Sequence, residues 1–232
     1  MERIIVLPDA ALTARTAGLR LLLALIDAQS LTAPVHVALT GGSLGTQMLD
    51  SVAGEEVAGA VDWSQVHLWW GDERVAEDSD RNASQVRGWL DSIPIPAENV
   101  HEVARPGEVE DVDAAAAAYA EAVRDVHFAV VVLGVGPDGH VASLFPGRDE
   151  VDQDGKGAIA VHDSPKAPPL RVSLTRESLS DADEVWFVAA GAEKAPMVAA
   201  SVLPGEDPVP AARVRGRTAT LWFLDTAAAS SV

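Results

Sequence analysis

Short apolar runs rich in valine, leucine and tryptophan alternate along the chain with longer stretches rich in alanine and leucine. The short runs predict buried strands and the longer stretches predict helices. We predict strands at residues 4–7, 35–40, 66–70, 128–133, 185–190 and 220–224, and helices at residues 10–28, 43–52, 82–90, 113–125 and 193–200. This alternation is typical of an α/β fold, a doubly wound and mostly parallel sheet with helices on both faces.

Three proline-rich or polar stretches interrupt the pattern, at residues 94–106, 146–169 and 204–210. No shift in composition marks a second domain, so we expect residues 1–232 to form one domain with these stretches as loops. The middle stretch is long enough to cover a site.

The chain is strongly acidic, with Lys+Arg 17 against Asp+Glu 35 and a net charge of −18. This charge argues against nucleic acid or an anionic membrane surface as a partner. A small anionic ligand would need the few cations to be concentrated in one place. With no cysteine and no His-x-x-x-His pair, we expect neither a metal nor a cofactor.

The first residues do not combine a basic region with a long apolar run, and no apolar run approaches the roughly 20 residues that cross a bilayer. We therefore expect a cytoplasmic protein without a membrane segment, and we expect a monomer.

Residues that follow strands carry the candidate chemistry, because ligands of open α/β sheets bind at the carboxyl ends of the strands. Four such junctions stand out, at residues 41–43, 71–74, 134–140 and 191–194. In the first of them, Gly41 and Gly42 precede a helix, where backbone N–H groups and the helix dipole favour an anion such as phosphate. The alternative for this segment is a tight turn in which Ser43 caps the helix.

A serine esterase is a competing interpretation, because residues 41–45 also match the G-x-S-x-G pattern of a serine nucleophile. Ser43 would then act with Asp138 or Asp72 and with His140 or His162. Against this, the serine follows the second predicted strand, which is early for that fold, and no oxyanion segment precedes it.

The glycine loop at residues 134–139 matches the G-x-G-x-x-G dinucleotide fingerprint, but Pro137 and the position in mid-chain do not fit that motif. What the loop presents is Asp138 beside His140. A histidine can act as a general base near neutral pH, and a carboxylate two residues away can fix its tautomer. The scarce cations Arg74 and Lys194 follow other strands and could neutralise a phosphate.

In this order, the motifs resemble those of the 6-phosphogluconolactonases of the pentose phosphate pathway, which are related in fold to glucosamine-6-phosphate deaminase. The resemblance spans most of the chain and is carried by residues 40–43, 70–75, 80–82, 134–146, 164–175, 191–195 and 203–204. The block at residues 134–146 is highly specific.

The resemblance implies an ester hydrolase that opens 6-phospho-D-glucono-1,5-lactone to 6-phosphogluconate. His140 would activate the attacking water and Asp138 would orient His140. The residues implied in binding the sugar phosphate are Gly41, Gly42, Ser43, Asp72, Arg74, Arg171 and Lys194.

One departure from the family pattern and one alternative bear on this interpretation. The family commonly continues the glycine loop with Thr-Pro, whereas this chain has Leu44 and Gly45, which removes one hydroxyl contact with phosphate. A glucosamine-6-phosphate deaminase is the close alternative, but such enzymes typically carry Asp-Glu-Tyr where this chain has residues 72–74 as Asp-Glu-Arg.

Overall fold

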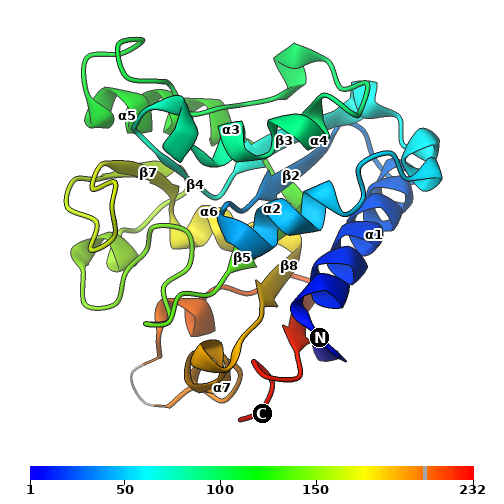
Figure 1. Ribbon diagram of the computed structural model, residues 1–232. Helices are drawn as coiled ribbons and strands as arrows, with labels where there is room; N and C mark the ends of the chain where they lie inside the picture. The colour runs from blue at the N-terminus through cyan, green and yellow to red at the C-terminus, as the bar shows by residue number, and fades with distance from the viewer. Residues whose placement is uncertain (206–207) are drawn as a thin grey trace.

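A six-stranded sheet, parallel throughout, forms the centre of the computed structural model, which describes residues 1–205 and 208–232 (Figure 1). Its strands lie in the order β1-β9-β8-β5-β2-β3. Their bounds are Glu2–Leu7 for β1, Val35–Leu39 for β2, Val66–Trp70 for β3, Phe128–Gly134 for β5, Ala182–Ala189 for β8 and Ala219–Asp225 for β9. All six predicted strands are therefore present, and the predicted parallel sheet is confirmed.

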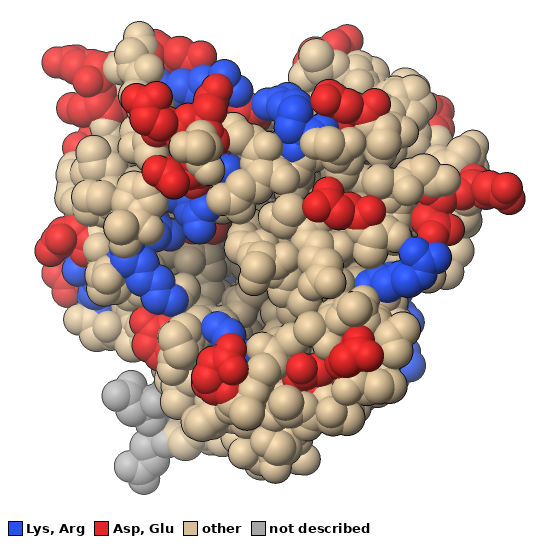
Figure 2. All heavy atoms as spheres, in the orientation of Figure 1, with Lys and Arg blue, Asp and Glu red and all other residues tan. Residues whose placement is uncertain are grey.

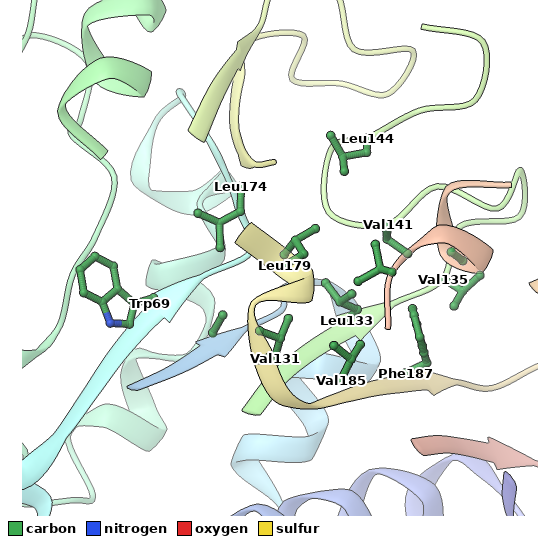
Figure 3. Packing of buried hydrophobic residues seen from close by; sticks show 14 of the residues in the cluster. Trp69, Val131, Leu133, Val135, Val141, Leu144, Leu174, Leu179, Val185 and Phe187 are labelled. Carbon is green, nitrogen blue, oxygen red and sulfur yellow. The ribbon is translucent and has the colours of Figure 1, made fainter. Parts of the chain in front are cut away.

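Helices cover both faces of this sheet, because successive strand residues point to opposite sides and are apolar on both. In β8, Val185 and Phe187 belong to one buried cluster and Trp186 and Val188 to the other. Helices α1 (Ala10–Gln29), α2 (Gly42–Asp50), α3 (Asn82–Gln85) and α4 (Arg87–Leu90) pack on one side, and α5 (Val112–Val123), α6 (Arg176–Ser180) and α7 (Ala195–Val202) on the other. The doubly wound fold class is confirmed. Figure 3 shows the buried cluster that contains Val185 and Phe187, between β5, β8 and α6.

A second sheet was not predicted. It is antiparallel, has the order β4-β7-β6, and consists of β4 (Asp72–Arg74), β7 (Arg171–Leu174) and β6 (Ala158–Val161). Its strands are short, and β4 is polar, so none shows the long apolar run that marks the strands of the main sheet. Val172 and Leu174 are fully buried in the cluster that also holds Leu133 of β5, so packing on the main sheet stabilises them.

We predicted a single loop at residues 146–169, and this prediction is wrong in part, because the segment contains β6 and a 3-10 helix at Asp149–Asp152. The helix expected at residues 82–90 divides at Val86, whose backbone leaves the helical conformation, into α3 and α4. The loop predicted at residues 204–210 lies partly outside the described residues. Among the helices that the structure describes, none is both long enough and apolar enough to span a bilayer.

Candidate active site

A cavity of about 410 Å³ opens at the carboxyl edge of the main sheet. Figure 2 shows the hollow, with Lys and Arg side chains along its margin, between α2 and the start of α7 as placed in Figure 1. All four junctions chosen from the sequence contribute to its wall. The predicted site residues that line it are Gly41, Gly42, Ser43, Asp72, Arg74, His140, Arg171 and Lys194. Asp138 does not line the cavity but contacts His140.

The Gly41–Gly42 turn leads into α2 without a side-chain cap. Gly41 occupies the N-cap position, so the interpretation of Ser43 as a helix cap is wrong. A Cβ atom on Gly41 would lie 1.8 Å from Oδ1 of Asn82, and Gly42 has a φ of +80°, so both positions require glycine. The backbone at this turn is thus exposed to the cavity beside the first amides of a helix, as an anion site requires.

Gly45 accounts for the departure from the usual Thr-Pro. A Cβ atom there would lie 2.7 Å from the carbonyl oxygen of Thr40, so glycine lets α2 pack closely against the end of β2. Leu44 also lines the cavity. The backbone amides of the loop are retained although the threonine hydroxyl is missing.

Four cations line the same cavity, namely Arg74, Arg171, Lys194 and also Lys166. Burial lowers the pKa of Lys166, and the neighbouring charges of Lys194 and Arg171 lower it further, although Asp138 opposes them. Among the described residues, neither Lys166 nor Lys194 has an ion-pair partner within 4.0 Å. A bound anion would relieve this mutual repulsion, so the charge distribution fits a phosphate ligand.

Arg171 is the first residue of β7. Its guanidinium donates hydrogen bonds to the carbonyl oxygens of Pro168 at 3.1 Å, Lys166 at 2.9 Å and Ala167 at 3.2 Å. Its Nη1 atom lies 3.7 Å from Oδ2 of Asp72. Much of its hydrogen-bonding capacity therefore holds the segment that carries Lys166.

Asp72 is buried at the cavity wall and accepts hydrogen bonds from its neighbours. The hydroxyl of Ser143 donates to its Oδ2 at 2.6 Å, and Nδ2 of Asn82 donates to its backbone carbonyl at 2.8 Å. Asp72 thereby joins the loop of His140 to α3. These contacts give Asp72 an organising position, and contact with substrate stays a prediction.

His140 and Asp138 form a pair on the loop that follows β5. Nδ1 of His140 and the carboxylate of Asp138 are hydrogen-bonded, and the His140 side chain is 14% exposed. The ring lies beside Phe145, with ring centroids 4.6 Å apart, and a Cβ atom on Gly136 would lie 2.0 Å from its Nδ1. Gly136 thus leaves space for the ring, which explains this glycine without a nucleotide.

The electrostatics of this pair favour a neutral imidazole. Burial lowers the pKa of His140 below its ordinary value, and the hydrogen bond and charge of Asp138 oppose this only in part. Burial alone would raise the pKa of Asp138, but the hydrogen bond and charge of His140, together with backbone hydrogen bonds, outweigh it, and the net direction is down. An ionised Asp138 accepts the Nδ1 proton, which leaves the lone pair of Nε2 available as a base.

The esterase interpretation lacks its central contact. Ser43 is exposed, and within residues 1–205 and 208–232 its hydroxyl makes no hydrogen bond to a histidine. His162 instead contacts Asp113, at 3.1 Å. Residues 135–148 contain no helix, so the glycine loop also lacks the helix start that a dinucleotide fingerprint needs.

Two polar cavity residues that the sequence did not single out are Lys166 and Asn82. A signal existed for the first, since the chain has only three lysines and Lys166 and Lys194 both line the cavity. Asn82 reads from the sequence as an ordinary helix start. Only the fold reveals that its side chain lies between Asp72 and Gly41.

An α/β sheet whose carboxyl edge combines a glycine turn, four cations and a histidine–carboxylate pair defines a protein that acts on a small anionic substrate. The chain belongs to the family of glucosamine-6-phosphate isomerases/6-phosphogluconolactonase, whose model matches residues 8–222. The resemblance based on the motifs is thereby confirmed.

Individual relatives agree with this assignment. A 6-phosphogluconolactonase of Streptomyces coelicolor is 44% identical over 246 residues, covering 99% of this chain and 94% of the relative. One of Mycobacterium tuberculosis is 40% identical, covering 98% and 97%. The solved structure of 6-phosphogluconolactonase from Trypanosoma brucei superposes with a TM-score of 0.84 at 27% identity, covering 100% of this chain and 99% of that one.

Proposed function

We propose that this protein hydrolyses 6-phospho-D-glucono-1,5-lactone to 6-phosphogluconate. The observation that carries the proposal is the His140–Asp138 pair in a cavity that also holds a glycine turn and four cations. The relatives named 6-phosphogluconolactonase support the substrate. A deaminase of the same family is less well supported, because Arg74 stands where such enzymes typically carry tyrosine.

In the proposed reaction, Nε2 of His140 removes a proton from water as the water oxygen attacks the lactone carbonyl. The carbonyl oxygen becomes an oxyanion, which the positive potential of the cavity stabilises. When the oxyanion re-forms the carbonyl, the bond to the ring oxygen breaks and this oxygen takes the proton from His140. His140 returns to its neutral form, and the new carboxylic acid releases its proton to solvent to give 6-phosphogluconate.

The roles of the other residues follow from charge and position. The backbone of Gly41 and Gly42, with Arg74 and Lys194, would bind the phosphate, which fixes the far end of the substrate. Asp138 would hold the imidazole in the tautomer with Nε2 unprotonated.

The test is hydrolysis of freshly prepared 6-phosphogluconolactone by the purified protein. We expect a rate far above spontaneous hydrolysis and no release of ammonia from glucosamine 6-phosphate. A lactone rate equal to the protein-free rate would refute the proposed function, and ammonia release would favour the deaminase. Ser43→Ala, which removes the only hydroxyl that the esterase interpretation could use, should keep most of the lactonase activity.

We also propose that the enzyme works as a cytoplasmic monomer without a nucleic-acid partner. The net charge of −18 disfavours polyanions, and a chain without cysteine fits a reducing compartment. One copy of the chain brings His140, Arg74 and Lys194 to the same cavity, which supports a monomer. Sedimentation should give a mass near 24.3 kDa, and twice that mass would contradict the monomer.

A further inference from the structure

Glu73 lies between two cavity residues, Asp72 and Arg74, yet its own side chain is buried in the protein and only 1% exposed. Its carboxylate accepts three backbone hydrogen bonds. Oε1 accepts from the N–H of Arg74 and of Asn82, both at 2.7 Å, and Oε2 accepts from the N–H of Ala83 at 2.9 Å.

These hydrogen bonds join β4 to the start of α3. The first amides of a helix have no partner within the helix, and here the carboxylate of Glu73 takes up two of them. The guanidinium of Arg74 in turn donates to the carbonyl oxygen of Asp80 at 2.8 Å. The segment between β4 and α3 is thus closed by contacts at both ends, and these contacts fix the backbone of Arg74.

Asn82 connects α3 to the Gly41–Gly42 turn. Its Nδ2 donates to the carbonyl oxygen of Asp72 at 2.8 Å, while its Oδ1 lies where a side chain on Gly41 would be. That Oδ1 atom is buried and has no hydrogen-bond partner among the described residues. A shift of α3 would therefore change the positions of Asn82 and of the Gly41 turn together.

We infer that Glu73 is a positioning residue for phosphate binding, which sets Arg74 and Asn82 against the Gly41–Gly42 turn without contacting the substrate. The inference rests on the proposed function for the identity of the ligand. A carboxylate is required because three N–H donors face its two oxygens. An amide would turn an NH₂ group toward at least one of these donors and repel it.

The protonation of Glu73 provides an independent check. Burial raises the pKa of Glu73, and the three backbone N–H groups together with the charge of Arg81 oppose this only in part. A protonated carboxyl would present an O–H group to backbone donors. Affinity for phosphate should therefore weaken in mild acid in the wild-type protein, and a Glu73→Gln variant should have lost the contribution of Glu73 to that dependence.

The experiment compares wild type and Glu73→Gln by calorimetric binding of inorganic phosphate and by lactone hydrolysis. We expect the Kd for phosphate and the KM for lactone to rise about tenfold, with kcat changed much less. Asp111→Asn is the matched control, because Asp111 caps α5 through the N–H of Ala114 at 2.8 Å and does not line the cavity. The control keeps a capping side chain and should keep the Kd and KM of the wild type.

An unchanged Kd and KM in Glu73→Gln, with only a lower melting temperature, would overturn the inference. If that variant does not fold, Glu73→Asp keeps the charge and shortens its reach, and should weaken phosphate binding; a wild-type Kd there would equally overturn it. A wild-type protein that binds phosphate but does not hydrolyse the lactone would refute the proposed function, while the phosphate measurement would still test Glu73.

Discussion

His140 and a group of three other histidines lie at opposite ends of the strands of the main sheet. His36 and His67 are second residues of β2 and β3 and face each other in register, whereas His140 follows the carboxyl end of β5. Nδ1 of His67 lies 2.8 Å from Nε2 of His101, and the ring of His101 stacks on Trp69 with centroids 3.9 Å apart. We call His36, His67 and His101 the histidine cluster.

Burial lowers histidine pKa values at both edges, but the neighbours differ. Burial, and then the charges of nearby histidines, lower the pKa of His36 and of His101 to about 4. At His140 the second influence has the opposite sign, because Asp138 raises the pKa. A low pKa therefore does not by itself mark a base; a carboxylate partner and an open cavity distinguish His140.

The largest effect is expected from removing the base. His140→Ala should lower kcat by about 10² to 10⁴-fold, because general-base assistance is lost. The matched change in the other region, His101→Ala, should leave kcat near the wild-type value. Steady-state hydrolysis of the lactone measures both, and an active His140→Ala variant would remove the functional difference between the two regions.

Removing only the carboxylate partner should have a smaller effect. Asp138→Asn is expected to lower kcat about tenfold or more, because the imidazole loses its oriented tautomer. In the proposed mechanism neutral His140 is the active form, so activity should fall as the pH drops through its pKa, which burial lowers below the ordinary histidine value. Since Asp138 raises that pKa, the acid limb of the kcat/KM profile should move to lower pH in the variant. An acid limb at the wild-type pH would show that Asp138 does not influence the protonation of His140.

Cations line the cavity around His140, and removing one of them should affect substrate binding more than the chemical step. Lys194→Ala should raise KM about tenfold with a smaller change in kcat, because one charge-assisted contact with phosphate is lost. Lys156→Ala is the control, since Lys156 pairs with Asp181 and does not line the cavity. Equal KM values in the two variants would argue against Lys194 as a phosphate ligand.

The smallest effect concerns stability and arises from the histidine cluster. The cluster pKa values lie below the unfolded value of about 6.5, so the unfolded chain binds more protons and the free energy of unfolding decreases from pH 6.5 toward 4. Allowing for partial exposure, His36 and His101 should each contribute about 1 kcal/mol. Urea unfolding at pH 7 and pH 5 should show a weaker pH dependence for His101→Gln; an unchanged dependence would exclude the cluster as its source.

The main sheet could be predicted from the sequence because its strands are apolar on both faces, as the run from Val185 to Val188 illustrates. The small sheet could not, since strands such as β4 gain their stability from tertiary packing. At the site, the strand-end rule brought together Gly41, Arg74, His140 and Lys194. The position of Lys166 depends on carbonyl contacts with Arg171, which no local pattern reveals.

The most direct test of the central claim is a crystal structure with bound 6-phosphogluconate. We expect the phosphate to lie at the Gly41–Gly42 turn beside Arg74 and Lys194, and the carboxylate carbon of the product to face Nε2 of His140. A phosphate beside His140, or a carboxylate directed away from it, would contradict the assignment of His140 as the base for lactone hydrolysis.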